Sequence, residues 1–146
     1  MKILVMNGPN LNMLGLREPQ HYGRETYASL VERIRAHCEG KGIDVTLFQS
    51  NHEGAMVDEI QNAMGVYDGI VMNPGAYTHT SIAIPDALKA VGIPCVEIHI
   101  SDVNQREEYR KISYVRPACI GSVIGHGTDG YMEAIDLLVA HLEASK

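Results

Sequence analysis

The chain has 146 residues, of which 45% are hydrophobic and 21% charged, and it carries a formal net charge of −6. A length of this order is typical of one compact domain, so we expect residues 1–146 to form a single domain. The negative charge argues against a nucleic-acid partner, and the first apolar run is too short for a signal peptide or a membrane span, which leaves the cytoplasm as the expected location.

Apolar runs alternate with amphipathic patterns along the chain. Short continuous or alternating apolar runs predict strands, and apolar residues spaced three to four apart predict helices. In chain order the predicted elements are a strand at 2–7, a helix at 25–40, a strand at 44–49, a helix at 54–66, a strand at 69–75, a helix at 81–91, a strand at 94–100, a short helix at 104–112, a strand at 118–125 and a closing helix at 130–144.

Five strands that alternate with helices indicate an α/β protein whose sheet is parallel, with right-handed crossovers. We expect a flavodoxin-like, doubly wound, five-stranded parallel sheet of order 2-1-3-4-5 with helices on both faces. Such sheets bind ligands outside the carboxyl ends of their strands, where the strand order reverses.

Polar side chains follow the predicted strands at that same edge. Four strands deliver Asn, Gln, His, Arg and Ser rather than the Lys and Glu of an ordinary solvated surface. The residues are Asn7 and Asn10 after the first strand, Gln49 and Asn51 after the second, Asn73 and His79 after the third, and His99, Ser101, Arg106 and Arg110 at and after the fourth. Their co-location predicts the functional site.

The connection after the first strand is unusually long. Such a connection usually has about 2–6 residues, whereas residues 9–24 intervene here. Loops of this length in compact domains tend to be lids or binding loops, so we expect a lid with Gly15 and Gly23 as hinges. The alternative is a flexible insertion without a function, in which Tyr22 only makes packing contacts. The loop lacks the glycine and lysine pattern of known nucleotide-binding motifs.

The three cysteines, Cys38, Cys95 and Cys119, are widely separated, and none belongs to a C-x-x-C pair with histidines at zinc-ligand spacing. We expect no structural metal site and interpret the cysteines as small buried hydrophobic residues rather than catalytic thiols.

Glu97 and His99 lie two residues apart in the fourth predicted strand. Alternate residues of a strand point to the same face, so this spacing lets the Glu97 carboxylate orient or charge the imidazole. The alternative is that His99 is a core histidine at the buried end of a strand.

Long motifs extend over nearly the whole chain in one collinear series. They are NGPNLNMLG at 7–15, REPQHYG at 17–23, QSNHEG at 49–54, NPGAYTHTSIAI at 73–84, EIHISD at 97–102, REEYRKISY at 106–114 and GY at 130–131. In these stretches the chain resembles the type II 3-dehydroquinases, hydro-lyases that convert 3-dehydroquinate to 3-dehydroshikimate. The resemblance implies a role in the shikimate pathway of aromatic amino acid biosynthesis or in quinate breakdown, and the residues leave that choice open.

The resemblance also implies an anti elimination through an enolate, without cofactor, metal or Schiff base. Tyr22 is implied to be the base and Arg17 the essential arginine of the same loop. A free phenol has a pKa of about 10, and a nearby guanidinium favours its ionised form, to which Arg106 adds. His99 matches the acid that protonates the leaving hydroxyl, and Asn10 matches the residue that holds a water on the enolate oxygen.

The remaining matched positions hold a small anionic substrate. The backbone amides of Ile100 and Ser101, assisted by the Ser101 hydroxyl, are implied to bind its carboxylate. The positions implied to bind its ring hydroxyls are Asn73, His79 and Arg110.

Asp86 matches a residue that, in the family, reaches the site of a neighbouring subunit, which implies a trimer and a homododecamer of four trimers. Pro85 stands where an Arg is common, which leaves room for a different subunit contact. Asn104 replaces a frequent His. Asp102 replaces a frequent Asn beside the carboxylate site, where its charge would weaken anion binding unless the side chain points away. His126 stands where an apolar residue is usual.

Three alternatives remain. A related hydro-lyase or quinate-pathway enzyme would use the same site on a slightly different acid. A non-enzymatic flavodoxin-like module would bind flavin or phosphate, although the chain has no Trp and one Phe, beside seven Tyr, to stack on a flavin. A metal-dependent lyase would be built on His79, His99 and Glu97, whose spacing matches no recognised ligand motif.

Overall fold

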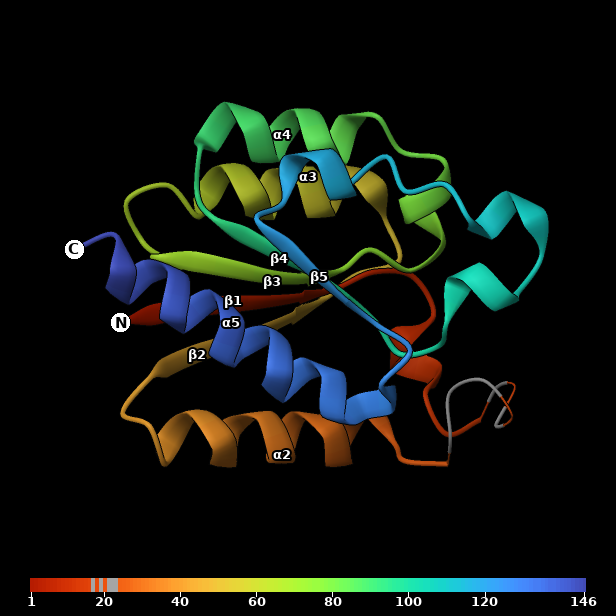
Figure 1. Cartoon of the computed structure of the whole chain (residues 1–146), viewed down its shortest axis with the longest axis horizontal. Helices are drawn as coiled ribbons and strands as arrows, with labels where there is room; N and C mark the ends of the chain where they lie inside the picture. Colours follow the sequence, from red (N-terminus) through yellow and green to blue (C-terminus); the bar gives the residue numbers. More distant parts are fainter. Residues whose placement is uncertain (17, 19, 21–23) are drawn as a thin grey trace.

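Five parallel strands form one sheet in the order β2-β1-β3-β4-β5 in the computed structural model (Figure 1). The structure describes residues 1–16, 18, 20 and 24–146. The doubly wound order expected from the sequence is confirmed. The strands are β1 (Lys2–Asn7), β2 (Asp44–Gln49), β3 (Gly69–Asn73), β4 (Cys95–His99) and β5 (Gly121–Ile124).

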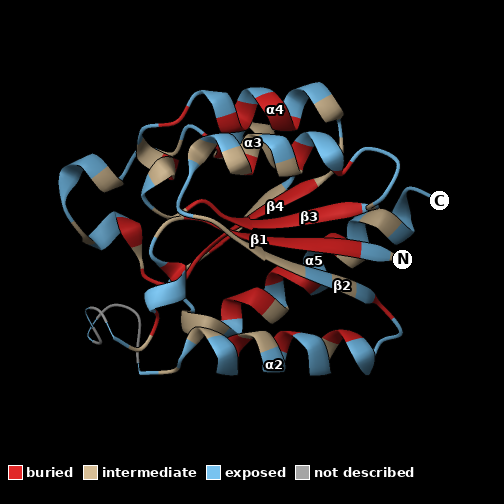
Figure 2. Cartoon of the chain, turned by 180° about the vertical axis from the view of Figure 1, so that it is seen from behind, coloured by how far each residue is buried: buried red, intermediate tan, exposed pale blue. Residues whose placement is uncertain are grey.

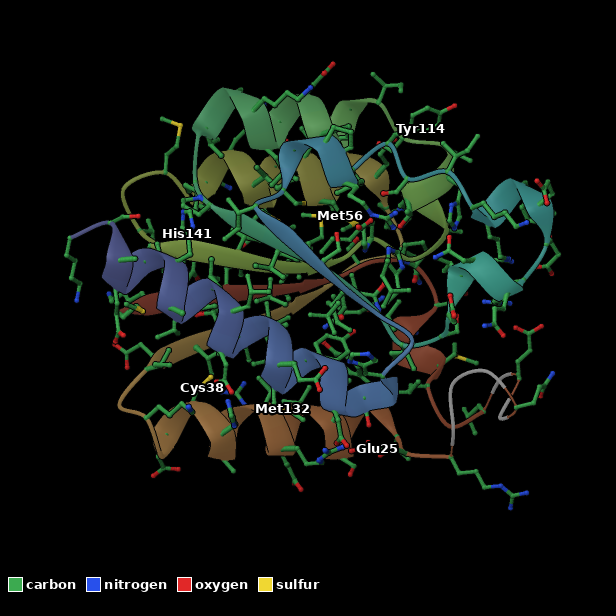
Figure 3. The ribbon with its side chains drawn as sticks, in the orientation of Figure 1. Glu25, Cys38, Met56, Tyr114, Met132 and His141 are labelled. Atoms are coloured by element: carbon green, nitrogen blue, oxygen red, sulfur yellow. The ribbon has the colours of Figure 1, made fainter. Side chains whose placement is uncertain are left out.

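Two long helices cover each face of the sheet. One face carries α2 (Tyr27–Glu39) and α5 (Gly130–Ala144), and the other carries α3 (Glu53–Asn62) and α4 (Ala83–Val91), so the predicted helices on both faces are confirmed (Figure 1). The side chains of Cys38 and Met132 lie in the apolar layer of α2 and α5, whereas Met56 lies in that of α3 and α4 (Figure 3). None of the helices described is both long and apolar enough to cross a bilayer.

The central strands are buried on both faces, as their unbroken apolar runs predict. Every residue of β3 and β4 is buried, and β1 is buried from Ile3 onward, whereas the edge strand β2 is partly exposed (Figure 2). The alternation of the strands sends Val96 and Ile98 into the layer of α2 and α5, and sends Cys95 to the opposite face.

The prediction of one helix over 104–112 is wrong. The segment forms two separate 3₁₀ turns, Val103–Gln105 and Glu108–Arg110, because the backbone is extended at Arg106 and Glu107 between them. Strand β5 begins three residues later than expected, after a 3₁₀ turn at Arg116–Ala118.

The burial of the cysteines differs from the expectation at one position. Cys38 and Cys95 are buried, but Cys119 is only half-buried, since it lies on the turn that leads into β5 and not within the strand.

The ends of β1 and β3 approach each other closely at the carboxyl edge of the sheet. The amide of Gly8 donates to the carbonyl of Asn73 over 2.8 Å. A Cβ atom added to Gly8 would lie 2.4 Å from the carbonyl oxygen of Pro74, a contact that the backbone cannot relieve without moving. A residue without a side chain is therefore required where the strand order reverses.

We expect Gly8→Ala to lower the free energy of unfolding by about 1–3 kcal/mol, because the added methyl group forces the two strand ends apart. Gly54→Ala is the matched control: it lies in α3 with no atom within 4 Å of the added Cβ, so helix propensity leaves stability unchanged or raises it. Urea titrations of both variants measure the difference. Equal midpoints would show that the strand ends tolerate a wider spacing.

Candidate active site

A cavity of about 160 Å³ opens at the carboxyl edge, at the ends of β1, β3 and β4. In Figure 1 this is the side, away from both termini, where the 3₁₀ segments that follow β1, β3 and β4 lie. The cavity therefore lies where the topology of a doubly wound sheet places its ligand. The described residues that line it are Pro9, Asn10, Leu11, Asn73, Gly75, Ala76, His79, His99, Ile100, Ser101, Val103, Arg106 and Arg110.

A buried carboxylate lies directly behind the cavity. Glu97, in β4, has no exposed surface, and its Oε2 lies 2.9 Å from Nε2 of His99, so the contact predicted from their spacing is present. Three further side chains donate to the same carboxylate: Ser113 Oγ to Oε2 over 2.5 Å, Ser122 Oγ to Oε1 over 2.9 Å and Arg116 Nε to Oε1 over 2.7 Å. Four donors thus satisfy one buried charge.

Ser113, Arg116 and Ser122 are residues that the sequence did not single out. Ser122 could have been found from the sequence, because it is the in-register partner of Glu97 once β4 and β5 are paired. Ser113 and Arg116 could not, because they lie on irregular backbone before β5, where no sequence pattern predicts their contacts. The Ser113 hydroxyl also accepts a hydrogen bond from the amide of Arg116, which holds the two donors together.

Opposing effects determine the ionisation of Glu97. Burial on its own raises its pKa, but the hydrogen bond and charge of His99, together with the bonds from Ser113 and Arg116, lower the pKa to about 2. The carboxylate is therefore ionised at neutral pH and accepts a hydrogen bond from Nε2 of His99. This bond leaves Nδ1 as the ring nitrogen of His99 that remains available for chemistry.

His79 follows β3, and a backbone carbonyl fixes the tautomer of its ring. Its Nδ1 lies 2.7 Å from the carbonyl of Ile112, which only accepts, so Nδ1 carries the proton. Burial lowers the pKa of His79, and the nearby His99 and Arg110 lower it further against the opposing effect of the carbonyl. The neutral ring therefore presents Nε2 as an acceptor.

Two arginines make the cavity wall positive. The side chains of Arg106 and Arg110 are 5% and 19% exposed, so their charges act where solvent screens them little. Arg110 Nε donates to Glu107 over 2.8 Å, and Arg106 Nη1 reaches the hydroxyl of Ser101 over 3.4 Å. Such a wall fits an anionic ligand.

The peptide segment Ile100–Ser101 forms part of the floor beside these arginines. The carboxylate of Asp102 accepts a hydrogen bond from the amide of Asn104 and is not among the atoms that line the cavity. The charge of Asp102 therefore lies outside the lining of the cavity.

Asn10 lies at the mouth of the cavity in a left-handed conformation, with φ of 70°. The backbone amide of Asn10 donates to Oδ1 of Asn51 over 3.1 Å, and this bond connects the start of the long loop to the segment that follows β2. Asparagine tolerates this conformation better than most residues, so the backbone holds the Asn10 side chain at the cavity.

The two described ends of the long loop lie against each other. Gly15 has φ of 90°, and a Cβ added to it would lie 3.1 Å from the carbonyl oxygens of Arg24 and Glu25. Glu25 is bound in turn by Thr128 Oγ1 over 2.6 Å and by Arg33 Nη1 over 2.8 Å (Figure 3). These contacts hold the two ends of the loop together.

Some predicted residues do not join this group. Asp86 is exposed in the first turn of α4 and does not line the cavity. Arg17, Tyr22 and Gly23 lie outside the described residues.

Metal ligation receives no support from the geometry. Among residues 1–16, 18, 20 and 24–146, no three His, Cys, Asp or Glu side chains converge in a way that could hold a metal ion. Nε2 of His99 is already bonded to Glu97, and Nδ1 of His79 to a backbone carbonyl. No lysine is found among the described residues that line the cavity.

Comparisons with known proteins agree with the geometry. The sequence model of the family described as Dehydroquinase class II matches residues 1–139. A Ruegeria pomeroyi protein named 3-dehydroquinate dehydratase is 49% identical over 140 residues, which cover 96% of this chain and 94% of that protein. A Neosartorya fischeri protein named catabolic 3-dehydroquinase 1 is 53% identical over 134 residues, which cover 92% and 89%. The crystal structure of a type II dehydroquinase from Butyrivibrio crossotus DSM 2876 matches with a TM-score of 0.94 and 56% identity, over 95% of this chain and 97% of that one.

The low pKa of Glu97 links stability to pH. Its pKa is about 2 in the folded protein against 4.5 ordinarily, so its contribution to stability is complete above about pH 4.5 and is lost as the pH falls through about 2. We expect Glu97→Gln to flatten the fall in unfolding free energy between pH 5 and pH 3, measured by urea titration. Glu39→Gln, at an exposed carboxylate at the end of α2, should keep the wild-type slope. An unchanged slope in Glu97→Gln would mean that folding does not lower the pKa of Glu97.

Proposed function

Since the chain belongs to the class II dehydroquinase family, we propose that it dehydrates 3-dehydroquinate to 3-dehydroshikimate in this cavity. The observation that carries the proposal is the imidazole of His99, which is held by a buried carboxylate beside a wall formed by Arg106 and Arg110. That arrangement supplies an acid next to a site for an anionic substrate.

The reaction begins with removal of the proton alpha to the ketone. Tyr22 takes this proton, and the electron pair of the broken C–H bond moves onto the carbonyl oxygen to give an enolate. Arg17 favours the ionised phenol that this step needs. Arg106 adds positive charge from the cavity, where its Nη2 lies 3.4 Å from Glu18 Oε2 on the same loop. Asn10 holds a water on the enolate oxygen.

The second step expels the hydroxyl group. The enolate electrons re-form the ketone and move into a new carbon–carbon double bond while the C–O bond breaks. His99 gives the proton on Nδ1 to the departing oxygen, which leaves as water. The ionised Glu97 keeps the imidazole in the orientation that this transfer needs.

The remaining side chains hold the ring during both steps. The amides of Ile100 and Ser101, with the Ser101 hydroxyl, bind the carboxylate, and the nearby guanidinium groups provide the positive field. Asn73, His79 and Arg110 bind the ring hydroxyls. No lysine or metal takes part.

We further propose that the protein assembles into trimers and into a dodecamer of four trimers. Asp86 is exposed on α4, where it is available to a neighbouring subunit. Large apolar side chains are also exposed: Ile82, one helical turn before Asp86, is 55%, Ile112 58% and Tyr114 42% exposed, and the amide of Tyr114 donates to the carbonyl of Thr78. Light scattering of the purified protein measures the assembly.

The direct test adds 3-dehydroquinate to the protein and follows the absorbance of the conjugated enone product. We expect turnover that EDTA leaves unchanged and that survives borohydride treatment in the presence of substrate. Loss with EDTA would favour the metal-dependent lyase, and loss with borohydride would indicate a lysine Schiff base. No turnover of 3-dehydroquinate, but activity on another hydroxy-keto acid, would favour a related hydro-lyase.

Variants test the roles of the acid and the base. We expect Tyr22→Phe and His99→Ala each to lower kcat by about 10²–10⁴-fold, because each removes one proton-transfer group. Arg17→Ala should also lower kcat, by removing the charge that favours the phenolate. Tyr67→Phe, just before β3 and far from the cavity, is the control and should keep wild-type kcat. Near-wild-type turnover in Tyr22→Phe would place the base elsewhere.

A further inference from the structure

A chain of hydrogen bonds runs beneath the cavity, on the sheet face covered by α2 and α5. The amide of Gly75 donates to Oδ1 of Asn73 over 3.1 Å, and Nδ2 of Asn73 donates to the hydroxyl of Tyr131 over 2.9 Å. The Tyr131 hydroxyl donates to Oδ1 of Asn7 over 2.5 Å, and Nδ2 of Asn7 reaches the hydroxyl of Tyr27 over 3.4 Å. Side chains from two strands and two helices thus form one network.

The direction of every bond follows from the first one. A backbone N–H can only donate, so Gly75 fixes Oδ1 of Asn73 as the acceptor and turns Nδ2 toward Tyr131. The Tyr131 hydroxyl must then accept from Asn73, which leaves its own hydrogen for Oδ1 of Asn7. A flipped Asn73 amide would bring two donors together at Gly75.

The members at the centre of this network are shielded from water. Tyr131 and Asn7 have no exposed surface, and Asn73 is 4% exposed. Burial raises the pKa of the Tyr131 phenol above its usual value of 10, and the bond from Asn73 only partly offsets this, so the phenol stays neutral and keeps the hydrogen that it donates. In these surroundings an unpaired amide or hydroxyl is costly, which enforces the directions.

An amide nitrogen carries two hydrogens, and the network uses only one of those on Asn73. We propose that Tyr131 is a positioning residue, which holds the Asn73 amide so that its second N–H donates to a hydroxyl oxygen of the substrate. The inference rests on the proposed function, because Asn73 lines the cavity in which 3-dehydroquinate binds.

The neighbouring histidine completes the recognition of hydroxyl groups. His79 presents Nε2 as an acceptor in the same cavity, whereas Asn73 presents a donor. A hydroxyl group both donates and accepts, so a polyhydroxylated ring satisfies both residues, whereas a ring with ether or keto groups in these positions leaves Nε2 of His79 without a donor.

The proposal depends on the hydroxyl group of Tyr131 and not on its aromatic ring. Phenylalanine would fill the same space but leave Nδ2 of Asn73 and Oδ1 of Asn7 without partners. The Asn73 side chain would then keep only the bond from the amide of Gly75 at Oδ1, and nothing would hold the direction of its Nδ2. Tyr27 is the natural comparison, because it lies at the far end of the same network and does not touch Asn73.

The test is a double-mutant cycle in the steady-state turnover of 3-dehydroquinate. We expect Tyr131→Phe to lower kcat/KM by about tenfold, mainly through KM, as the loss of one directed hydrogen bond implies. In an Asn73→Ala background, Tyr131→Phe should change kcat/KM by less than about twofold. Tyr27→Phe in the wild-type background should leave KM within about twofold.

The same fold-change in both backgrounds would mean that Tyr131 only stabilises the fold, and would overturn the proposal, as would an unchanged kcat/KM in Tyr131→Phe. Circular dichroism checks that each variant folds. If Tyr131→Phe does not fold, Asn7→Leu tests the proposal instead, because it removes the acceptor that orients the Tyr131 hydrogen. We expect Asn7→Leu to raise KM. An unchanged KM would overturn the proposal. Absence of turnover by the wild-type protein would instead contradict the proposed function.

Discussion

The ionised carboxylate of Glu97, enclosed within the fourth strand, is the constraint on which the carboxyl edge of this sheet depends. An ion without solvent contact is costly unless it is paired and fully hydrogen-bonded. Here the bonds come from His99 on the same strand, from Ser122 on the neighbouring strand, and from Ser113 and Arg116 in the irregular segment between them. That segment must therefore fold back along β4, and in return the carboxylate fixes the ring of His99.

The alternation of the strands separates this charged network from a neutral one. Glu97 and His99 share a strand face with Cys95, on the side of α3 and α4, whereas Asn7 and Asn73 point to the side of α2 and α5 and bond to Tyr131. The neutral network needs no counter-ion, because its amides and phenols carry no charge. An ionised network, that of Glu97 and His99, thus reaches the cavity from one face of the sheet. A neutral network with fixed hydrogen-bond directions, that of Asn73 and Tyr131, reaches it from the other face.

The sequence could predict what depends on periodicity. The central strands appear as unbroken apolar runs, and the two-residue spacing of Glu97 and His99 is enough to bring them together. The contacts of Arg116 depend on a 3₁₀ turn without any periodic signal, and Tyr131 falls among the buried apolar residues of α5, where only the folded structure shows that its hydroxyl has two polar partners. Asp86 is exposed in the single chain, and the role proposed for it depends on the proposed assembly.

The separation of the two faces also bears on the stereochemistry of the proposed elimination, in which the proton and the hydroxyl leave from opposite sides of the ring. His99 approaches the cavity from the face of α3 and α4. The described ends of the long loop lie on the other side: Leu11 and Leu14 pack into the layer of α2 and α5, and Gly15 meets Glu25 just before α2. The described ends of the loop and the side chain of His99 therefore lie toward opposite faces of the sheet. This arrangement fits the proposed anti elimination, which needs its acid and its base to act from opposite sides of the ring.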